Sequence, residues 1–228
     1  MAVTSPVSQR LTASGLLVLT FGTGMIDAIS VLVLGHVFVA NMTGNVIFLG
    51  FWFAQQRVVD MTAAVVAFVS FVLGAVVGGR FARHLEHDTR RWVTVALAVE
   101  SIVLVTLSVL AGAGVLDYHD NTKLILIAGL ALAFGSQNAT ARQFGIQELS
   151  TTVLTSTIVG IGVDSRLAGG TGKREKLRLS VVVTMCAGAV VGATLSQFVV
   201  APVIGMVAAL VALTAVLFWF GPPVPAGD

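Results

Sequence analysis

Eight runs of apolar residues, separated by short polar joins, constrain this chain more than any other feature. A helix needs about 20 predominantly apolar residues to cross the hydrocarbon core of a bilayer. Hydrophobic residues make up 56% of the 228-residue chain and charged residues 11%, which is too apolar for a soluble domain. The sequence therefore predicts an all-α polytopic membrane protein, a single domain over residues 1–228 with the lipid bilayer around it. The runs span residues 12–35, 37–54, 61–79, 92–113, 123–141, 151–163, 179–198 and 202–220.

The two halves of the chain resemble each other. The sequence GAVVG at residues 74–78 recurs at residues 188–192, 114 positions later. Residues 41–47 resemble residues 153–159 at an offset of 112, and the segment around Gly24 and Asp27 resembles the one around Gly135 and Asn138 at 111. Three matches in order at nearly one spacing predict an internal repeat. Its halves cover residues 11–113 and 122–220.

The positive charges indicate how these halves are related. Nine of the thirteen Lys and Arg residues fall within residues 80–91 and 166–178. The positive-inside rule places both loops in the cytoplasm. Each basic loop of one half corresponds to a join without net positive charge in the other half. This pattern is typical of an inverted repeat, in which each half crosses the membrane an odd number of times.

Each half holds four apolar runs, so one run in each half must not cross the membrane by itself. The short runs 37–54 and 151–163 are the natural candidates, although a break of the first run at residues 22–24 satisfies the parity equally well. We expect about six crossings plus two short broken or re-entrant helices. The alternative is eight plain spans with one basic loop on the wrong side. With Arg10 inside, both termini are expected in the cytoplasm of a bacterium, and the protein in its inner membrane.

Asp27 is the first candidate functional residue, because it lies within the first apolar run. A carboxyl group at bilayer depth is costly and has to be neutralised. Asp27 is therefore either a site for a substrate, a cation or a proton, or a group bonded inside the bundle for packing specificity. Arg142 is its candidate partner if the two polar entry segments meet. The alternative for Arg142 is extension to the cytoplasmic surface, as long basic side chains do near helix ends.

The string of Asn41, Thr43, Gly44 and Asn45 has the composition of a helix start. Asn and Thr oxygens accept bonds from the free N–H groups there, and Gly permits close approach. The second half offers Ser150, Thr151, Thr152, Thr155 and Thr157 at the matching place. If both short helices begin near the midplane, their positive ends would face each other and suit a small polar or anionic solute. Alternatively, the hydroxyls bond back to the preceding turn.

Further polar groups lie in the apolar runs. Glu100 is a lone carboxyl in the fourth run, expected to be protonated or paired, with proton coupling as a second possibility. Gln137 and Asn138 lie in the fifth run and extend the expected cavity lining. The proton-coupling candidates are Asp27 and Glu100. The candidate substrate-binding residues are Asp27, Ser30, Asn41, Thr43, Gly44, Asn45, Gln137, Asn138, Arg142, Thr152 and Thr155.

Other classes of function lack their signals. No nucleophile elbow, zinc-binding His-Glu-x-x-His motif or aspartate cluster is present in the sequence, so we expect neither an enzyme nor a cofactor. One Cys and isolated His residues give no expected metal site. The basic residues lie between spans without interleaved aromatic residues, which argues against nucleic acid as a partner. The glycines at 74, 78, 79, 188 and 192 are spaced for close helix packing, and such faces are also compatible with a homo-oligomer.

Residues 27–30, 36–45, 137–139 and 151–155 together resemble the signature of the YoaK-like family of small bacterial inner-membrane proteins. The resemblance covers nearly the whole chain, and the string Asn-Met-Thr-Gly-Asn is its most specific part. It implies a polytopic helical membrane protein with about six spans and no settled activity. This chain carries Ser156 where the family usually has Gly.

The residues therefore favour a small-solute permease or carrier whose site lies near the midplane between the two broken segments. The alternative is a membrane scaffold or accessory subunit that transports nothing and whose polar residues serve helix packing.

Overall fold

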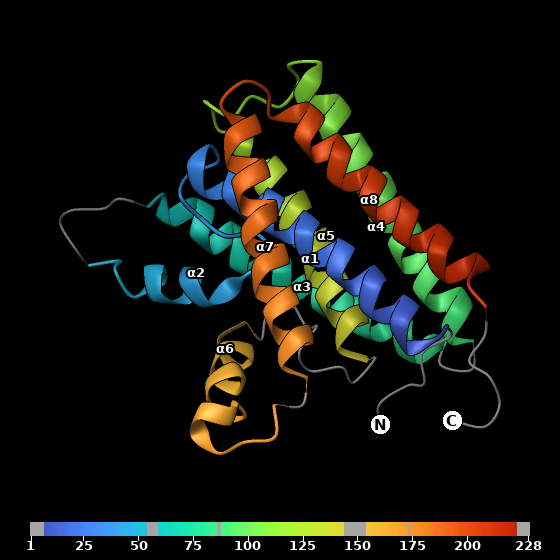
Figure 1. Ribbon diagram of the computed structural model, residues 1–228. Coiled ribbons are helices and arrows are strands. Elements are labelled where there is room, and N and C mark those ends of the chain that lie inside the picture. The colour runs from blue at the N-terminus through green and yellow to red at the C-terminus, as the bar shows by residue number, and fades with distance from the viewer. Residues whose placement is uncertain (1–6, 54–58, 86–87, 144–153, 173, 223–228) are drawn as a thin grey trace.

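The computed structural model of the chain describes residues 7–53, 59–85, 88–143, 154–172 and 174–222. Within these ranges the secondary structure is helical, with turns between the helices (Figure 1). The elements in chain order are α1 (Gln9–Leu32), α2 (Met42–Leu49), α3 (Met61–His84), α4 (Thr89–Gly112), α5 (Lys123–Gln143), α6 (Leu154–Val163), the 3₁₀ helix η3 (Arg166–Ala168), α7 (Glu175–Ser196) and α8 (Ala201–Phe220).

Six of these helices, α1, α3, α4, α5, α7 and α8, are long and apolar enough to cross a membrane. This confirms the predicted all-α polytopic architecture with about six crossings. The second and sixth apolar runs form the short helices α2, of 8 residues, and α6, of 10 residues. At a rise of about 1.5 Å per residue neither crosses a bilayer alone, so eight plain spans are excluded. The first run is one continuous helix through Gly22 and Gly24, so it is not the broken one.

Side-chain caps account for where several of the long helices begin. Ser8, Asp60 and Asp88 accept hydrogen bonds from backbone N–H groups in the first turns of α1, α3 and α4. Such caps satisfy donors that have no partner within the helix. Pro202 stands in the first turn of α8, where its missing N–H is of no consequence.

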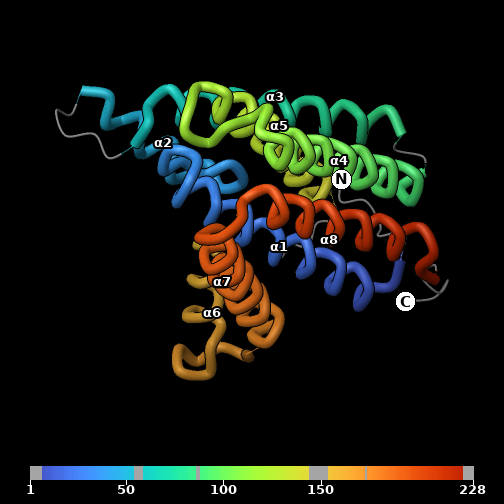
Figure 2. The backbone as a smooth tube through the Cα atoms, turned by 90° about the horizontal axis from the view of Figure 1, so that it is seen from above, coloured from blue at the N-terminus to red at the C-terminus, as the bar shows by residue number. Residues whose placement is uncertain are grey.

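The long helices pack in the order α7, α1, α8, α4, α5, α3. Seen from above, α1 and α8 lie between the pair α6 and α7 on one side and the group α3, α4 and α5 on the other (Figure 2). The short helix α2 packs on α3, and α6 packs on α7. In Figure 1 both short helices begin near the middle of the molecule and run outward in different directions, α2 to the left and α6 downward.

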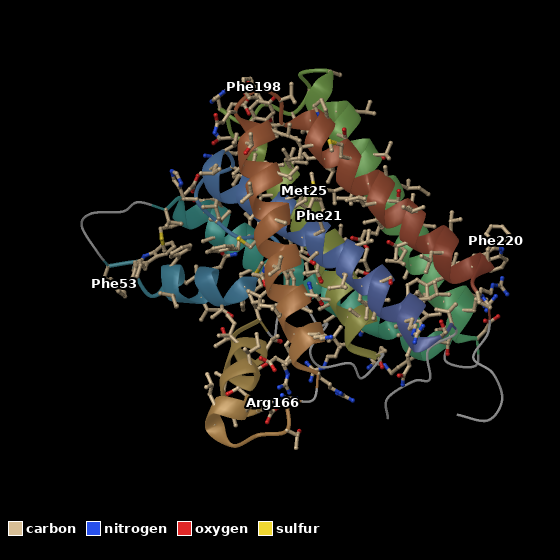
Figure 3. The ribbon with its side chains drawn as sticks, viewed as in Figure 1. Phe21, Met25, Phe53, Arg166, Phe198 and Phe220 are labelled. Carbon is tan, nitrogen blue, oxygen red and sulfur yellow. The ribbon has the colours of Figure 1, made fainter. Side chains whose placement is uncertain are left out.

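Two helix pairs approach each other backbone to backbone. On α7, a Cβ added to Gly188 would overlap the Phe21 carbonyl oxygen, and one added to Gly192 would overlap that of Met25. Figure 3 labels Phe21 and Met25 on α1, where α7 passes in front of it. Gly24 on α1 makes the reciprocal approach, because a Cβ there would overlap the Met185 carbonyl oxygen.

The pair α3 and α5 repeats this contact. A Cβ on Gly74 would overlap the Leu132 carbonyl oxygen, one on Gly78 would lie 2.9 Å from the Ser136 carbonyl oxygen, and one on Gly135 would overlap the Phe71 carbonyl oxygen. The predicted packing role of the glycines at 74, 78, 188 and 192 is therefore confirmed. Gly79 is the exception, because an added Cβ there would meet nothing within 4 Å.

The central pair, α4 and α8, is joined by hydrogen bonds from side chains to backbone. Ser101 Oγ donates to the Ala208 carbonyl over 2.9 Å, and Ser108 Oγ donates to that of Ala201 over 2.7 Å. At the start of α4 the Arg90 guanidinium donates to the Trp219 carbonyl over 2.9 Å and to that of Gly221 over 2.8 Å. The two helices therefore run antiparallel along most of their length.

Candidate functional site

The segment between α1 and α2 is folded into the protein. It turns at Gly35 and His36, whose φ angles of 114° and 60° lie in the left-handed region. Beyond this turn Val37, Val39 and Ala40 have no exposed surface. Irregular backbone at membrane depth is tolerated only where its polar groups find partners in the protein or in a cavity. The buried backbone groups of this loop therefore need hydrogen-bond partners within the protein.

Asp27 supplies acceptors for this loop. Its side chain lies on α1, and the residue is 5% exposed. Oδ1 accepts from the N–H groups of Val39 and Ala40 over 3.0 and 2.9 Å, and Oδ2 accepts from Asn41 Nδ2. A carboxylate at the start of a helix also offsets the partial positive charge of the free N–H groups there. Asp27 thus fastens the start of α2 to the last third of α1.

Asn45 fastens the same loop from the other side. Its Oδ1 accepts from the Phe38 N–H over 2.9 Å, and its Nδ2 donates to the Phe38 carbonyl over 2.6 Å. The Phe38 ring stacks on Phe48 with a centroid distance of 6.2 Å. It also covers Gly44, where an added Cβ would lie 2.5 Å from the ring. Asn41 and Asn45 therefore tie the start of α2 to Asp27 on α1 and to Phe38 in the preceding loop.

A pocket of about 320 Å³ opens between α1, α7 and the Phe38 loop. Asp27 is the one charged residue among the described residues that line it, and small side chains of α1 and α7 account for much of the rest. Ligand pockets range upward from about 300 Å³, so this one suits a small solute. The lining residues are Gly24, Asp27, Ala28, Val31, Leu32, Phe38, Met185, Ala189 and Ala193.

The second half presents its polar residues differently. Asn138, which is aligned with Asp27 in the predicted repeat, donates from Nδ2 to the Phe134 carbonyl over 2.9 Å and takes part in further interactions. Thr157 is buried, Thr155 is exposed, and Thr152 lies outside the described residues. Arg142 is exposed at the end of α5. Among the described residues, no ion pair joins Arg142 to Asp27, whose partners are those of the loop.

Gln137 belongs to a separate polar contact. Its Nε2 donates to Glu100 Oε1 over 2.7 Å, across the interface of α5 and α4. Glu100 is 4% exposed and lies in the middle of α4. Both residues are therefore buried. Their contact lies between α4 and α5, whereas the Asp27 pocket lies between α1 and α7.

The structure thus brings together four of the predicted site residues: Asp27, Asn41, Asn45 and Ser30, whose hydroxyl donates to the Asp27 carbonyl over 3.1 Å. Asn41 occupies the N-cap position as expected, yet its side chain does not cap the helix. That expectation was wrong, because the amide is used as a donor to Asp27. Thr43 is exposed.

Sequence reasoning missed the apolar residues of the pocket. Phe38, Ala28 and Ala193 carry no polar group that would distinguish them from lipid-facing residues. The GAVVG string at residues 188–192 was the available signal, because it predicted that α7 packs closely on another helix. It did not indicate that this helix is α1.

The fold and the loop define a class: a polytopic helical membrane protein with six long helices and short helices between them. The sequence of residues 15–217 matches the model of a family described as a protein of unknown function, DUF1275. The chain is also 32% identical over 195 residues to the UPF0700 transmembrane protein YoaK of Bacillus subtilis, covering 81% of this chain and 83% of the relative. No solved structure matches it.

The chain therefore belongs to the DUF1275 family, in which YoaK is a relative, and it is an integral membrane protein. The resemblance that was read from its polar motifs is thereby confirmed.

Proposed function

We propose that this protein is a small-solute permease whose site is the pocket beside Asp27. The observation that carries the proposal is the buried, irregular loop after α1, held by Asp27 and Asn45 next to a pocket of about 320 Å³. Broken segments at membrane depth are where transporters bind their solutes. A chain that served helix packing alone would have no need of a pocket at this place.

Because the Asp27 carboxyl oxygens are bonded to the loop, the open lining of the pocket is apolar and favours a small solute with an apolar part. Small side chains at Gly24, Ala28 and Ala193 leave room, while Phe38 and Met185 offer apolar contact. An anionic solute fits this pocket less well than a neutral solute does, because Asp27 already places a carboxylate at the start of α2. An anion fits the other half better, where Asn138 stands at the matching position.

We also propose that the two halves form an inverted repeat. When each helix is exchanged for its counterpart (α1 for α5, α3 for α7, and α4 for α8), the packing order becomes its own reverse, so the neighbours of each helix correspond. The reciprocal glycine contacts support parallel pairs of α1 with α7 and α3 with α5. With α4 antiparallel to α8, each helix of the first half then runs opposite to its counterpart. In transporters with such symmetry the substrate site lies at the interface of the two halves.

For the orientation we propose a bacterial inner membrane with both termini in the cytoplasm. The start of α1, the start of α4 and the end of α8 lie at one end, since Gly221 contacts Val7 and accepts from Arg90. The positive-inside rule favours this end as cytoplasmic. Thiol labelling of Thr171→Cys and Asn121→Cys, each in a Cys186→Ser background, tests it. An impermeant maleimide applied to intact cells should label position 121 and not position 171; the reverse pattern would refute the orientation.

The permease proposal is tested by osmotic swelling of vesicles that contain the purified full chain. Glycerol, urea and acetate serve as small neutral and anionic probes. We expect faster entry of at least one neutral probe than in protein-free vesicles. Ala193→Phe, which fills the pocket, should remove the acceleration, whereas Ala187→Phe on the exposed face of α7 should keep it. Equal rates in the two variants would refute the site, and no acceleration by the wild type would refute transport of these probes.

A membrane scaffold is the second candidate, and one observation favours it: the carboxylate of Asp27 is fully used in bonds to its own chain. A scaffold predicts that filling the pocket alters stability and not permeability. Thermal unfolding of the Ala193→Phe variant in the same vesicles separates the two. Unchanged swelling with a lowered melting temperature would support the scaffold.

A further inference from the structure

Glu100 is a buried carboxyl group that the Asp27 pocket does not use. It lies midway along α4, is 4% exposed, and accepts one hydrogen bond, from Gln137 Nε2 over 2.7 Å. Intramembrane carboxyl groups are rare, and they mark ion or proton pathways. The question is which positive partner neutralises it.

No described basic side chain lies at the level of Glu100 on the helices packed against α4. Helix α8 carries no charged residue between Ala201 and Phe220. On α5 the charged residues are Lys123 and Arg142, at its two ends, and on α3 the residues Arg80, Arg83 and His84 lie in its last turns. The other charged residues of α4 itself are Arg90 and Arg91, in its first turn. An unpaired carboxylate in such surroundings is costly, so the group has to take up a proton when it is buried.

Two buried hydroxyl groups lie on the same two helices between Glu100 and the arginine-bearing end. Thr140 Oγ1 and Thr94 Oγ1 have no hydrogen-bond partner within the described part of the chain. Thr140 follows Gln137 by three positions and so shares its face of α5. Thr94 lies six positions before Glu100 on α4, so its side chain is turned about 120° away from that of Glu100, toward the face on which Ser101 bonds to α8. Buried hydroxyls are normally bonded to protein or to ordered water, so the Thr140 hydroxyl is a candidate contact for a water molecule.

We propose that Glu100 exchanges a proton with the end of the bundle that carries Arg90 and Arg142, along a hydrated path beside Gln137 and Thr140 on α5. In this step a hydronium ion gives its proton to the Glu100 carboxylate, which becomes a neutral carboxylic acid, and one water is left. Release reverses the step. Because Gln137 Nε2 donates a hydrogen bond to Glu100 Oε1, the proton is carried by Glu100 Oε2. The inference deepens the proposed permease by naming the proton as coupling ion, and proton exchange at Glu100 is measurable without any solute.

Infrared difference spectroscopy of the full chain in lipid vesicles tests this. The carbonyl stretch of a protonated carboxyl group should be present in the wild type, absent in Glu100→Gln and retained in Asp27→Asn. Transfer to D₂O should shift the band within the mixing time. Thr140→Val should slow that shift, while Thr106→Val should not, because Thr106 is exposed and bonded to its own helix over 2.8 Å.

Three results would overturn the inference: a band that survives Glu100→Gln, a wild-type band that does not shift in D₂O, or equal exchange in the two threonine variants. Thermal unfolding of each variant verifies that it is folded. Since swelling by neutral probes does not involve this band, failure here leaves the permease proposal intact. Failure of the swelling test likewise leaves proton exchange at Glu100 standing.

Discussion

Gly74 on α3 lies so close to Leu132 on α5 that any side chain at position 74 would overlap the Leu132 carbonyl oxygen. The same relationship holds between Gly188 on α7 and Phe21 on α1, its counterparts in the other half. Backbones that touch in this way let helices cross closely in a lipid environment, where apolar burial gives little drive for association. The contact at Gly188 sets the separation of α1 and α7, between which the pocket lies.

Replacing Gly74 by Ala should destabilise the protein by about 1–3 kcal/mol, because the added methyl group forces α3 and α5 apart. Gly79→Ala is the matched control on the same helix, since nothing lies within 4 Å of its added Cβ. That control should be neutral or stabilising by about 0.5–1 kcal/mol, from better helix propensity. Denaturation in detergent measures both changes. Similar melting temperatures for the two variants would contradict the contact.

Asp27→Asn should weaken the loop before α2. Hydrogen bonds to a charged group contribute about 1.5–3 kcal/mol each, and the amide at position 27 would face the Asn41 amide as a second donor. Amide hydrogen exchange at Val39 and Ala40 should speed up, whereas Ser30→Ala should leave it nearly unchanged, because Ser30 bonds only within α1.

The exchanged pair Asp27→Asn with Asn41→Asp should recover part of this protection, because a donor and an acceptor then face each other again. Exchange at positions 39 and 40 that is the same in wild type and Asp27→Asn would show that the carboxylate does not hold the loop.

Asp60 links stability to pH beside the turn at Gly35, whose carbonyl accepts a hydrogen bond from the Asp60 N–H over 3.1 Å. Burial raises the pKa of Asp60, but the hydrogen bond from Lys123 and that from the Ala63 N–H outweigh it and hold the pKa below its ordinary value. The Lys123 Nζ lies 2.9 Å from Asp60 Oδ2. Because the pKa is lower in the folded state, this stabilisation is present above the unfolded value of about 3.9 and lost as pH falls below it.

Asp60→Asn, which keeps a capping oxygen, should therefore lower stability at neutral pH by about 0.2–1 kcal/mol, as for other partly exposed pairs. The difference from wild type should shrink as pH falls below the unfolded value of about 3.9 and vanish once pH is below the lowered folded pKa of Asp60. Melting curves of both proteins across this range measure it, and a difference independent of pH would rule out the ion pair as its source.

Arg178 holds the end of α6 against α7. Its guanidinium donates to the Gly160 carbonyl over 2.7 Å and to Asp164 Oδ2 over 2.5 Å. Arg178→Ala should destabilise this junction by about 1 kcal/mol and speed hydrogen exchange in α6, because a charged donor at a helix end is lost. Lys176→Ala, at an exposed position on the same turn, should do neither. Equal protection of α6 in both variants would refute the role of Arg178.

The spans were predictable because they depend on local composition. Six of the apolar runs became six long helices, and the two short ones became α2 and α6, with helix ends shifted by a few residues where Asp88 and Ser8 act as caps. The GAVVG strings were correctly taken as packing sites, since glycines four apart expose backbone on one helix face. The identity of the partner helix was not predictable, because any helix with a matching groove would serve.

The polar residues were found as a group, but not their partners. Asp27 was placed opposite Arg142 as one of two alternatives, and in the fold it bonds to a loop 12 to 14 positions onward. That choice depends on the left-handed turn at Gly35 and His36, which brings the loop back beside α1. Gln137 was grouped with the substrate site and instead joins Glu100 on α4.

The sequence by itself determined a helical membrane protein with six long spans, because the length and composition of each span are local properties that are matched to the bilayer. Only the tertiary structure decided which polar groups meet and where a pocket remains. Those depend on helix crossings set by backbone contact at Gly74 and Gly188, and on one loop turning inward. Contacts of this kind join residues far apart in the chain, so no local pattern specifies them.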